Sequence, residues 1–206
     1  MKKTLLIYSG GLDSTVLLYH LRASGHDVEA VSFNYNQRHK REIDSAKNIC
    51  ALLSVEHSIV EIPQLSGSAL TGSGDVPHGH YAEESMKQTV VPNRNMVMIA
   101  HAASIAIAKD KDCLAYGCHA GDHAIYPDCR TEFVEAMRVA LSLCDWKQLE
   151  LLTPFVEFDK GWIARLGHEL KVPFDMTWTC YEGGEEPCGK CGSCVERAEA
   201  LATIEK

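Results

Sequence analysis

A short apolar run that leads directly into a glycine pair constrains the fold more than any other feature. Lys3 to Tyr8 is followed by Ser9-Gly10-Gly11-Leu12-Asp13-Ser14. A short apolar run without alternation is typical of a strand buried on both faces of a parallel sheet. Apolar residues then recur at helical spacing, with Asp13 or Ser14 as the expected N-cap and Gly25 as the expected C-cap. The chain therefore predicts a strand, a tight loop and a helix at its start.

Strands and helices alternate along the rest of the chain. The apolar patterns predict strands over 28–35, 58–62 and 113–117 and helices over 41–53, 95–109, 131–144 and 160–170. The helix at 95–109 is apolar nearly all round, which predicts burial. This alternation predicts an α/β fold with an open, mostly parallel, doubly wound sheet. Residues 64–92 are rich in glycine and lack periodicity, so they form a candidate lid.

Composition limits the class of protein. With 206 residues, of which 46% are hydrophobic, the chain suits one core with a small appendage. A formal net charge of −8 argues against a protein that coats nucleic acid, because phosphate contacts need clustered Lys and Arg. We expect no membrane span and no signal peptide. Nine cysteines in such a chain indicate reduced thiols, and hence a cytoplasmic protein.

The loop from Ser9 to Ser14 predicts a phosphate site. Its two glycines let the main chain turn tightly and approach an anion without a Cβ in the way. The hydroxyls of Ser9, Ser14 and Thr15, together with the free N–H groups of the helix start, can donate to phosphate oxygens. Asp13 is expected both to cap the helix and to help hold Mg²⁺ beside the phosphates. The alternative is a glycine-rich turn that only caps a helix.

Four cysteines near the end of the chain predict a metal site. Cys180, Cys188, Cys191 and Cys194 form a C-x7-C-x2-C-x2-C array in a segment rich in Gly and Pro. Four thiolates at this spacing suit one structural Zn²⁺ in a closed tetrahedral site, which staples the tail to the domain. An iron–sulfur cluster or a redox C-x-x-C pair is the alternative. The remaining cysteines are expected to pack as small hydrophobes, namely Cys50, Cys113, Cys118, Cys129 and Cys144.

The SGGLDS loop resembles the signature of the PP-loop ATP pyrophosphatase superfamily, whose fold is of the adenine nucleotide alpha hydrolase type. Further segments resemble the 7-cyano-7-deazaguanine synthase family. These are Tyr35-Asn36-Gln37-Arg38-His39 with Glu42, Val91-Pro92-Asn93-Arg94-Asn95, Tyr126-Pro127-Asp128-Cys129-Arg130 and the ending from Thr179 through Cys194. Two positions depart from the family pattern, since Asn36 and Ile125 each stand where the family usually has Gly. Asn tolerates a positive φ, whereas Ile adds bulk.

The resemblance implies a carbon–nitrogen ligase of queuosine biosynthesis. Such an enzyme converts 7-carboxy-7-deazaguanine, ammonia and ATP into the nitrile, with release of AMP and pyrophosphate, in two rounds of adenylation. ATP would bind at Tyr8, Ser9, Gly10, Gly11, Leu12, Asp13, Ser14 and Thr15. Family members resemble homodimers, and no direct contact with nucleic acid is expected. The implied division places a PP-loop domain at 1–175 and a zinc segment at 176–206.

Several residues are candidates for contact with the substrate or for catalysis. Arg94, Arg130 and Lys160 would neutralise phosphate charge or hold the substrate carboxylate. Asp122 and Asp128 would accept N–H groups of the guanine-like edge, but helix-capping or turn residues would look the same. Asn95 and Tyr126 complete the set. The rival functions are a PP-loop tRNA-modifying enzyme, such as a thiolase or lysidine-type ligase, and a non-catalytic nucleotide sensor.

Overall fold

A single parallel sheet organises the chain. The computed structural model describes residues 1–38, 40–62, 65–72, 74–81 and 84–204. Five strands form the sheet in the order β3-β2-β1-β4-β5, and every neighbouring pair is parallel. Their bounds are β1 Lys3–Ile7, β2 Asp27–Asn34, β3 His57–Glu61, β4 Cys113–Ala115 and β5 Glu150–Leu152.

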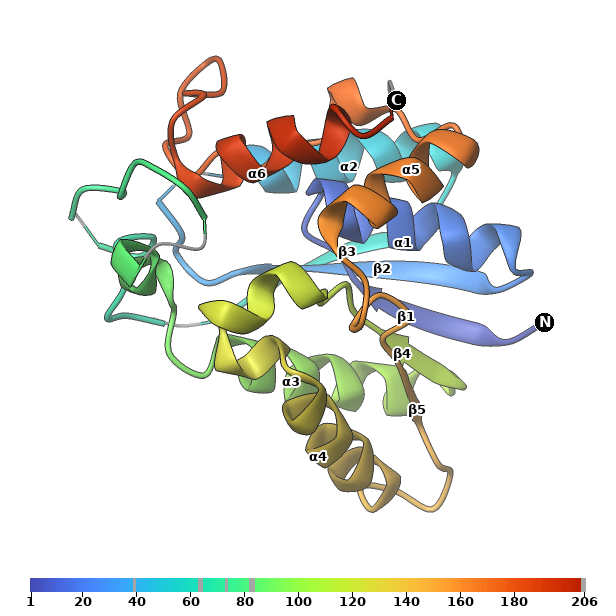
Figure 1. Ribbon diagram of the computed structural model, residues 1–206. Coiled ribbons are helices and arrows are strands. Elements are labelled where there is room, and N and C mark those ends of the chain that lie inside the picture. Colours follow the sequence, from blue (N-terminus) through green and yellow to red (C-terminus); the bar gives the residue numbers. More distant parts are fainter. Residues whose placement is uncertain (39, 63–64, 73, 82–83, 205–206) are drawn as a thin grey trace.

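Helices cover both faces of the sheet (Figure 1). The α-helices are α1 Leu12–Ala23, α2 Arg41–Leu53, α3 Arg94–Ala108, α4 Thr131–Ser142, α5 Lys160–Glu169 and α6 Gly192–Leu201. Short 3-10 helices are η1 Glu84–Thr89, η2 Ala120–Ala124, η3 Pro127–Cys129 and η4 Phe174–Met176. Helices α1, α2 and α5 lie on one face and α3 and α4 on the other, while α6 packs along α5. The predicted doubly wound α/β fold is confirmed.

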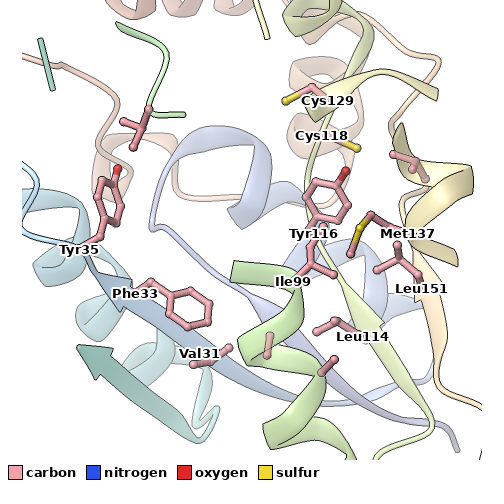
Figure 2. Close-up of a cluster of buried hydrophobic side chains, with 14 of the residues drawn as sticks. Val31, Phe33, Tyr35, Ile99, Leu114, Tyr116, Cys118, Cys129, Met137 and Leu151 are labelled. Carbon is pink, nitrogen blue, oxygen red and sulfur yellow. The ribbon is translucent and has the colours of Figure 1, made fainter. Parts of the chain in front are cut away.

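Two apolar clusters, one on each face, hold the layers together. On one face, Leu17 of α1 and Ile163 of α5 belong to a cluster with Leu6 and Ala30 of the sheet. On the other, Ile99 of α3 and Met137 of α4 pack against Val31, Leu114 and Leu151 (Figure 2). Because strand side chains alternate between faces, neighbours such as Leu5 and Leu6 enter opposite clusters. This explains why the strands are apolar without alternation.

The predicted elements match the observed ones within a few residues, with four differences. Strand β5 has only three residues, too few for a pattern. The N-cap of α1 is Gly11, not Asp13 or Ser14, and no side chain caps it. Helix α3 buries one face only, and Met96 is exposed. Cys144 is exposed although it was expected in the core, whereas Cys50, Cys113, Cys118 and Cys129 are buried.

The segment expected to form a lid is fastened to the cysteine-rich tail. Gln64, and residues 73, 82 and 83 within this segment, lie outside the described residues, as does His39. Gly79 N donates to Lys190 O at 3.0 Å, and His78 forms a bridge with Cys191. Leu70, Val76 and Met86 are buried. Motion of this segment stays a prediction, as does the division of the chain after residue 175. In the described part of the chain no helix is long and apolar enough to cross a membrane.

Candidate active site

A cavity of about 230 Å³ lies at the carboxyl edge of the sheet. It opens where β1, β2 and β4 end, which is the point at which the strand order reverses and where open α/β sheets bind ligands. Polar or charged side chains of the predicted set that line it are Tyr8, Ser9, Asp13, Ser14, Arg94, Asn95, Asp122, Tyr126 and Lys160. The sheet therefore gathers residues from distant parts of the chain into one site.

The glycine pair determines the path of the loop. Gly10 has φ +83°, and a Cβ there would lie 2.3 Å from Glu42 O and 2.6 Å from Ala46 N. Only glycine fits both this conformation and this approach to α2. Trp178 N donates to Gly10 O at 3.1 Å, so the loop is also held by the segment that precedes the cysteines. Gly11 lines the cavity and begins the N-terminus of α1.

The hydroxyls of the loop face in two directions. Ser9 Oγ accepts from Gly11 N at 3.1 Å and lies 3.0 Å from Ser14 Oγ, and both serines line the cavity. Thr15 Oγ1 instead donates to Gly11 O at 2.7 Å and contacts Tyr8 OH at 3.1 Å. Thr15 and Leu12 are fully buried and do not line the cavity. Thr15 therefore shapes the loop from inside, and its hydroxyl is not available to a phosphate.

A buried lysine, Lys160, balances the negative charge of Asp13 and Glu196. These three residues form the floor of the cavity. Lys160, 7% exposed, donates to Glu196 Oε2 at 2.6 Å and lies 3.2 Å from Asp13 Oδ2. Burial disfavours the charge of Lys160, but Asp13 and Glu196 outweigh it and raise its pKa. Asp159 caps α5 by accepting from Trp162 N, which positions Lys160 as the first residue of the helix. Asp13 Oδ1 is buried and has no partner among the described residues.

His119 completes this floor. It is 1% exposed, and its Nε2 faces Asp13 Oδ2 at 3.8 Å and Asp122 Oδ2 at 3.5 Å. It lies four residues beyond the end of β4, at the start of η2, so the turn after that strand brings it to the cavity. Its Nδ1 has no hydrogen-bond partner in the described part of the chain.

Arg94 and Glu42 line another part of the cavity wall. Arg94 NH1 donates to Tyr35 OH at 3.4 Å, and its guanidinium lies 6.0 Å from the centre of the Tyr35 ring. Burial raises the pKa of Glu42 to about 7, and the charge of Arg94 limits the rise. Asn93, which precedes α3, has φ 59°, so the chain turns sharply before presenting Arg94. Asn36 also has a positive φ of 63°, as the tolerance of Asn for this region predicts.

Two of the substrate candidates, Asp128 and Arg130, lie outside the cavity. Asp128 accepts from Asn95 N at 3.1 Å through Oδ2, and its carbonyl accepts from Asn95 Nδ2 at 3.1 Å. It thus caps α3 from a neighbouring turn. Arg130 is exposed, and its Nε donates to His123 O at 2.8 Å. Ile125 also does not line this cavity, so its bulk leaves the main cavity unobstructed.

The four tail cysteines converge as predicted. The sulfur atoms of Cys180, Cys188, Cys191 and Cys194 all lie within 4.8 Å of one another. Although burial opposes it, the N–H groups of Lys190 and Cys191 lower the pKa of the Cys188 thiol to about 7. Zinc–sulfur bonds of about 2.3 Å in a tetrahedron place the sulfurs roughly 3.8 Å apart. The donor set fits one metal ion, and a four-iron cluster between the thiolates would spread them further.

Comparison with known proteins identifies the family. The family described as "Queuosine biosynthesis protein QueC" matches residues 3–205. A 7-cyano-7-deazaguanine synthase from Methanoregula boonei is 55% identical over 203 residues, which are 97% of this chain and 94% of the relative. The chain belongs to the QueC family. Another synthase of the same name, from Caldicellulosiruptor saccharolyticus, is 50% identical over 98% of this chain and 92% of its own. The resemblance to an ATP-dependent ligase of queuosine biosynthesis is confirmed.

Solved structures with little sequence similarity to this QueC chain share its fold. The U34-tRNA thiolase NcsA from Methanococcus maripaludis, with its [4Fe-4S] cluster, has a TM-score of 0.55 at 16% identity. A 4-thiouridine synthetase in complex with RNA and ATP has a TM-score of 0.55 at 17% identity. Alignment covers 99% of this chain in both cases, but only 64% and 50% of those structures. At such identity the likeness concerns the fold alone.

Sequence reasoning missed several residues of the QueC chain's cavity. Among them are Ser32, Tyr116, His119, Thr179, Ser193 and Glu196. Ser32, Tyr116 and His119 lie near the carboxyl ends of β2 and β4, so the rule that ligands bind at strand ends was a usable signal. Glu196 had no comparable signal, because it follows the cysteines on a helix that packs against α5 from far along the chain.

Proposed function

We propose that this chain converts 7-carboxy-7-deazaguanine and ammonia into 7-cyano-7-deazaguanine at the expense of ATP. The observation that carries the proposal is the single cavity in which the SGGLDS loop, Lys160 and Arg94 meet. One end offers N–H groups and hydroxyls for phosphates, and the other offers a guanidinium for a carboxylate. Membership of the QueC family names the substrates that fit this combination.

The loop end of the cavity supports binding of pyrophosphate. Gly11, Ser9 and Ser14 line it at the N-terminus of α1, where the helix dipole favours negative charge. Lys160 faces the same space and would neutralise charge that develops on the leaving pyrophosphate. Tyr8 lines the wall, whereas Gly10, Leu12 and Thr15 support the loop from behind.

Asp13 fits the expected Mg²⁺ that accompanies ATP. Its Oδ1 is buried and has no partner among the residues that the structure describes, and a carboxylate oxygen beside phosphates is the donor type that Mg²⁺ takes. When bound, the ion would neutralise phosphate charge and orient the triphosphate. The residue itself keeps Oδ2 paired with Lys160 at 3.2 Å.

The other end of the cavity supports binding of the deazaguanine acid. Arg94 would hold the substrate carboxylate, and Asn95 and Tyr126 line the same wall. Asp122 is placed to accept paired N–H groups of the guanine-like edge. Because Asp128 already caps α3, we assign it no contact with substrate.

Two adenylations account for the change from acid to nitrile. A carboxylate resists attack by ammonia until its oxygen becomes a leaving group, which transfer of AMP provides. Ammonia then forms the C–N bond and loses a proton. The C–O bond between the acyl carbon and AMP breaks, and AMP leaves. A second adenylation, on the oxygen of the resulting amide, permits loss of that oxygen and formation of the nitrile. The main-chain donors of the loop stabilise the charge that leaves in both rounds.

The four-cysteine site supports a structural Zn²⁺, one per chain. All four positions of a tetrahedral ion are filled by thiolates, so no position is left for water or substrate. We further propose that the chain acts as a homodimer in the cytoplasm, where its nine cysteines remain reduced. Light scattering on the purified protein tests the dimer.

The experiment that tests the function is product analysis by mass spectrometry. Purified protein is incubated with 7-carboxy-7-deazaguanine, ammonium chloride and Mg-ATP, beside Asp13→Ala and Ser14→Ala variants. We expect the nitrile together with two AMP per nitrile in the parent protein, and loss of both by at least about 100-fold in Asp13→Ala. Cleavage of ATP only with tRNA, or no cleavage in the presence of the acid, would refute the proposal.

A further inference from the structure

A second, smaller cavity adjoins the first beneath the segment that precedes α3. Its volume of about 20 Å³ exceeds the roughly 10–15 Å³ that one water molecule needs. Asp122, Tyr126, Tyr181, Ser193 and Glu196 line both cavities. These five side chains thus form a shared wall between the two cavities.

The chemistry of the small cavity suits a small cation. Its described lining contains two carboxylates and four hydroxyls, all but that of Tyr81 on the shared wall, and no Lys, Arg or His. The tyrosine hydroxyls are held in place, since Tyr126 OH lies 2.7 Å from Thr89 Oγ1 and 3.3 Å from Tyr181 OH. The rings also offer π faces to a cation.

An unpartnered acceptor points to the same place from the main cavity. His119 Nε2 faces two carboxylates, so we assign the proton to it, and Nδ1 is left as a buried acceptor with no partner among the described residues. A Cβ added at Gly121, which lines the small cavity, would lie 3.0 Å from His119 Nδ1 and 2.9 Å from Glu196 Oε1. The two acceptors therefore both lie close to Gly121, which itself lines the small cavity.

Glu196 divides its carboxylate between two tasks. Its Oε2 accepts from Lys160 Nζ at 2.6 Å, on the side of the phosphate loop. Its Oε1 faces Gly121 instead. A donor on that side would satisfy both Oε1 and His119 Nδ1, and a cation there would balance the surplus of carboxylates over Lys160.

We propose that the small cavity beside Gly121 is a binding site for the ammonium ion that supplies nitrogen to the reaction. The inference rests on the proposed function. Ammonium has four N–H donors, no lone pair and the size of a water molecule, which matches a small chamber lined by acceptors. To react, it loses one proton to His119 Nδ1, whose ring then faces Asp13 and Asp122 as a cation, and the ammonia formed keeps the electron pair of that N–H bond. This pair then attacks the adenylated carbon in the main cavity, and AMP leaves.

The test is the KM for ammonium chloride, measured with saturating Mg-ATP and 7-carboxy-7-deazaguanine. Gly121→Ala places a methyl group against the two acceptors, and Ile125→Phe fills the small cavity from a residue that does not line the main one. We expect each variant to raise the KM for ammonium at least tenfold while the KM for ATP changes less than twofold. Gly184→Ala, an exposed position with ordinary contacts, serves as the matched control.

Two outcomes would overturn the inference. One is an unchanged KM for ammonium in both cavity variants when the parent protein makes the nitrile. The other is a KM, expressed as total ammonium, that falls about tenfold from pH 7 to 8, because this would show capture of neutral ammonia. If the parent makes no nitrile from ammonium at any concentration, the proposed function fails instead. Metal content and thermal unfolding confirm that each variant is folded.

Discussion

At the scale of single residues, the loop from Ser9 to Ser14 depends on a close approach between the backbone at Gly10 and the backbone of α2, which a side chain would prevent. Gly10 combines a positive φ with contact to the backbone of α2, and Trp178 holds its carbonyl. The loop is thus fixed by glycine and by two distant segments. Lys160 likewise works through distant partners, Asp13 and Glu196. A residue's role here is decided by what the fold brings next to it.

Replacing Gly10 by alanine should destabilise the protein strongly. The new Cβ would lie 2.3 Å from Glu42 O at φ +83°, so both strain and overlap oppose folding. We expect Gly10→Ala to lower the free energy of unfolding by at least about 2 kcal/mol in a urea titration. Gly184→Ala should change it by less than about 0.5 kcal/mol. Equal stability of the two variants would contradict this account of the loop.

Glu42 should make stability depend on pH. Burial raises its pKa from 4.5 to about 7, and Arg94 opposes the rise. The folded state therefore binds the proton more tightly, and the contribution of Glu42 to stability is lost as pH rises from about 4.5 through 7. Gln cannot lose this proton. Relative to the parent, Glu42→Gln should gain about 2 kcal/mol between pH 5 and pH 8, measured by urea unfolding. A constant difference between the two proteins would refute the shift.

At the scale of elements, helix ends are stabilised from outside their own segments. Asp128, in η3, accepts from Asn95 N in the first turn of α3. This contact joins two segments whose bonded residues lie 33 positions apart in the sequence. It also explains why Asp128 matched a substrate-binding pattern while serving as a cap.

Loss of this cap should affect stability and leave substrate binding intact. We expect Asp128→Ala to cost about 1 kcal/mol of unfolding free energy, and Asp128→Asn, which keeps an acceptor, to cost less. The KM for the deazaguanine acid should change less than twofold in both variants. A tenfold rise in that KM without loss of stability would show instead that Asp128 binds the substrate.

At the scale of the whole molecule, the cysteine cluster joins parts that carry the site. Cys180 follows the segment whose Trp178 holds Gly10, and Cys191 and Cys194 begin α6, which carries Glu196. The same cluster borders the segment at 78–79. Loss of a metal ion bound by the four cysteines should therefore disturb the loop from Ser9 to Ser14 and the cavity floor together, although none of these cysteines lines the cavity.

Removal of the metal should lower both stability and activity. We expect one zinc and no iron per chain by elemental analysis, and a fall of about 10 °C in Tm after chelation, as for a loss of about 4 kcal/mol of binding energy. Cys188→Ser should lose the metal, whereas Cys144→Ser, at the exposed cysteine outside the cluster, should keep it. Iron in the purified protein, or an unchanged Tm without metal, would refute this.

The sequence by itself determined most of the strands and helices, though not β5 or α6, as well as the tight turn from Ser9 to Ser14 and the grouping of four cysteines, because each depends on residues close together in the chain. The period of apolar residues, the position of glycines and the spacing of cysteines each determine the structure of a short segment, so each can be recognised from that segment alone. Only the tertiary structure decided that Thr15 faces inward, that Asp128 and Arg130 lie outside the cavity, and that His119 and Glu196 belong to its floor. Those outcomes depend on which strand ends and helices meet, and contacts between distant segments leave no periodic trace in the sequence.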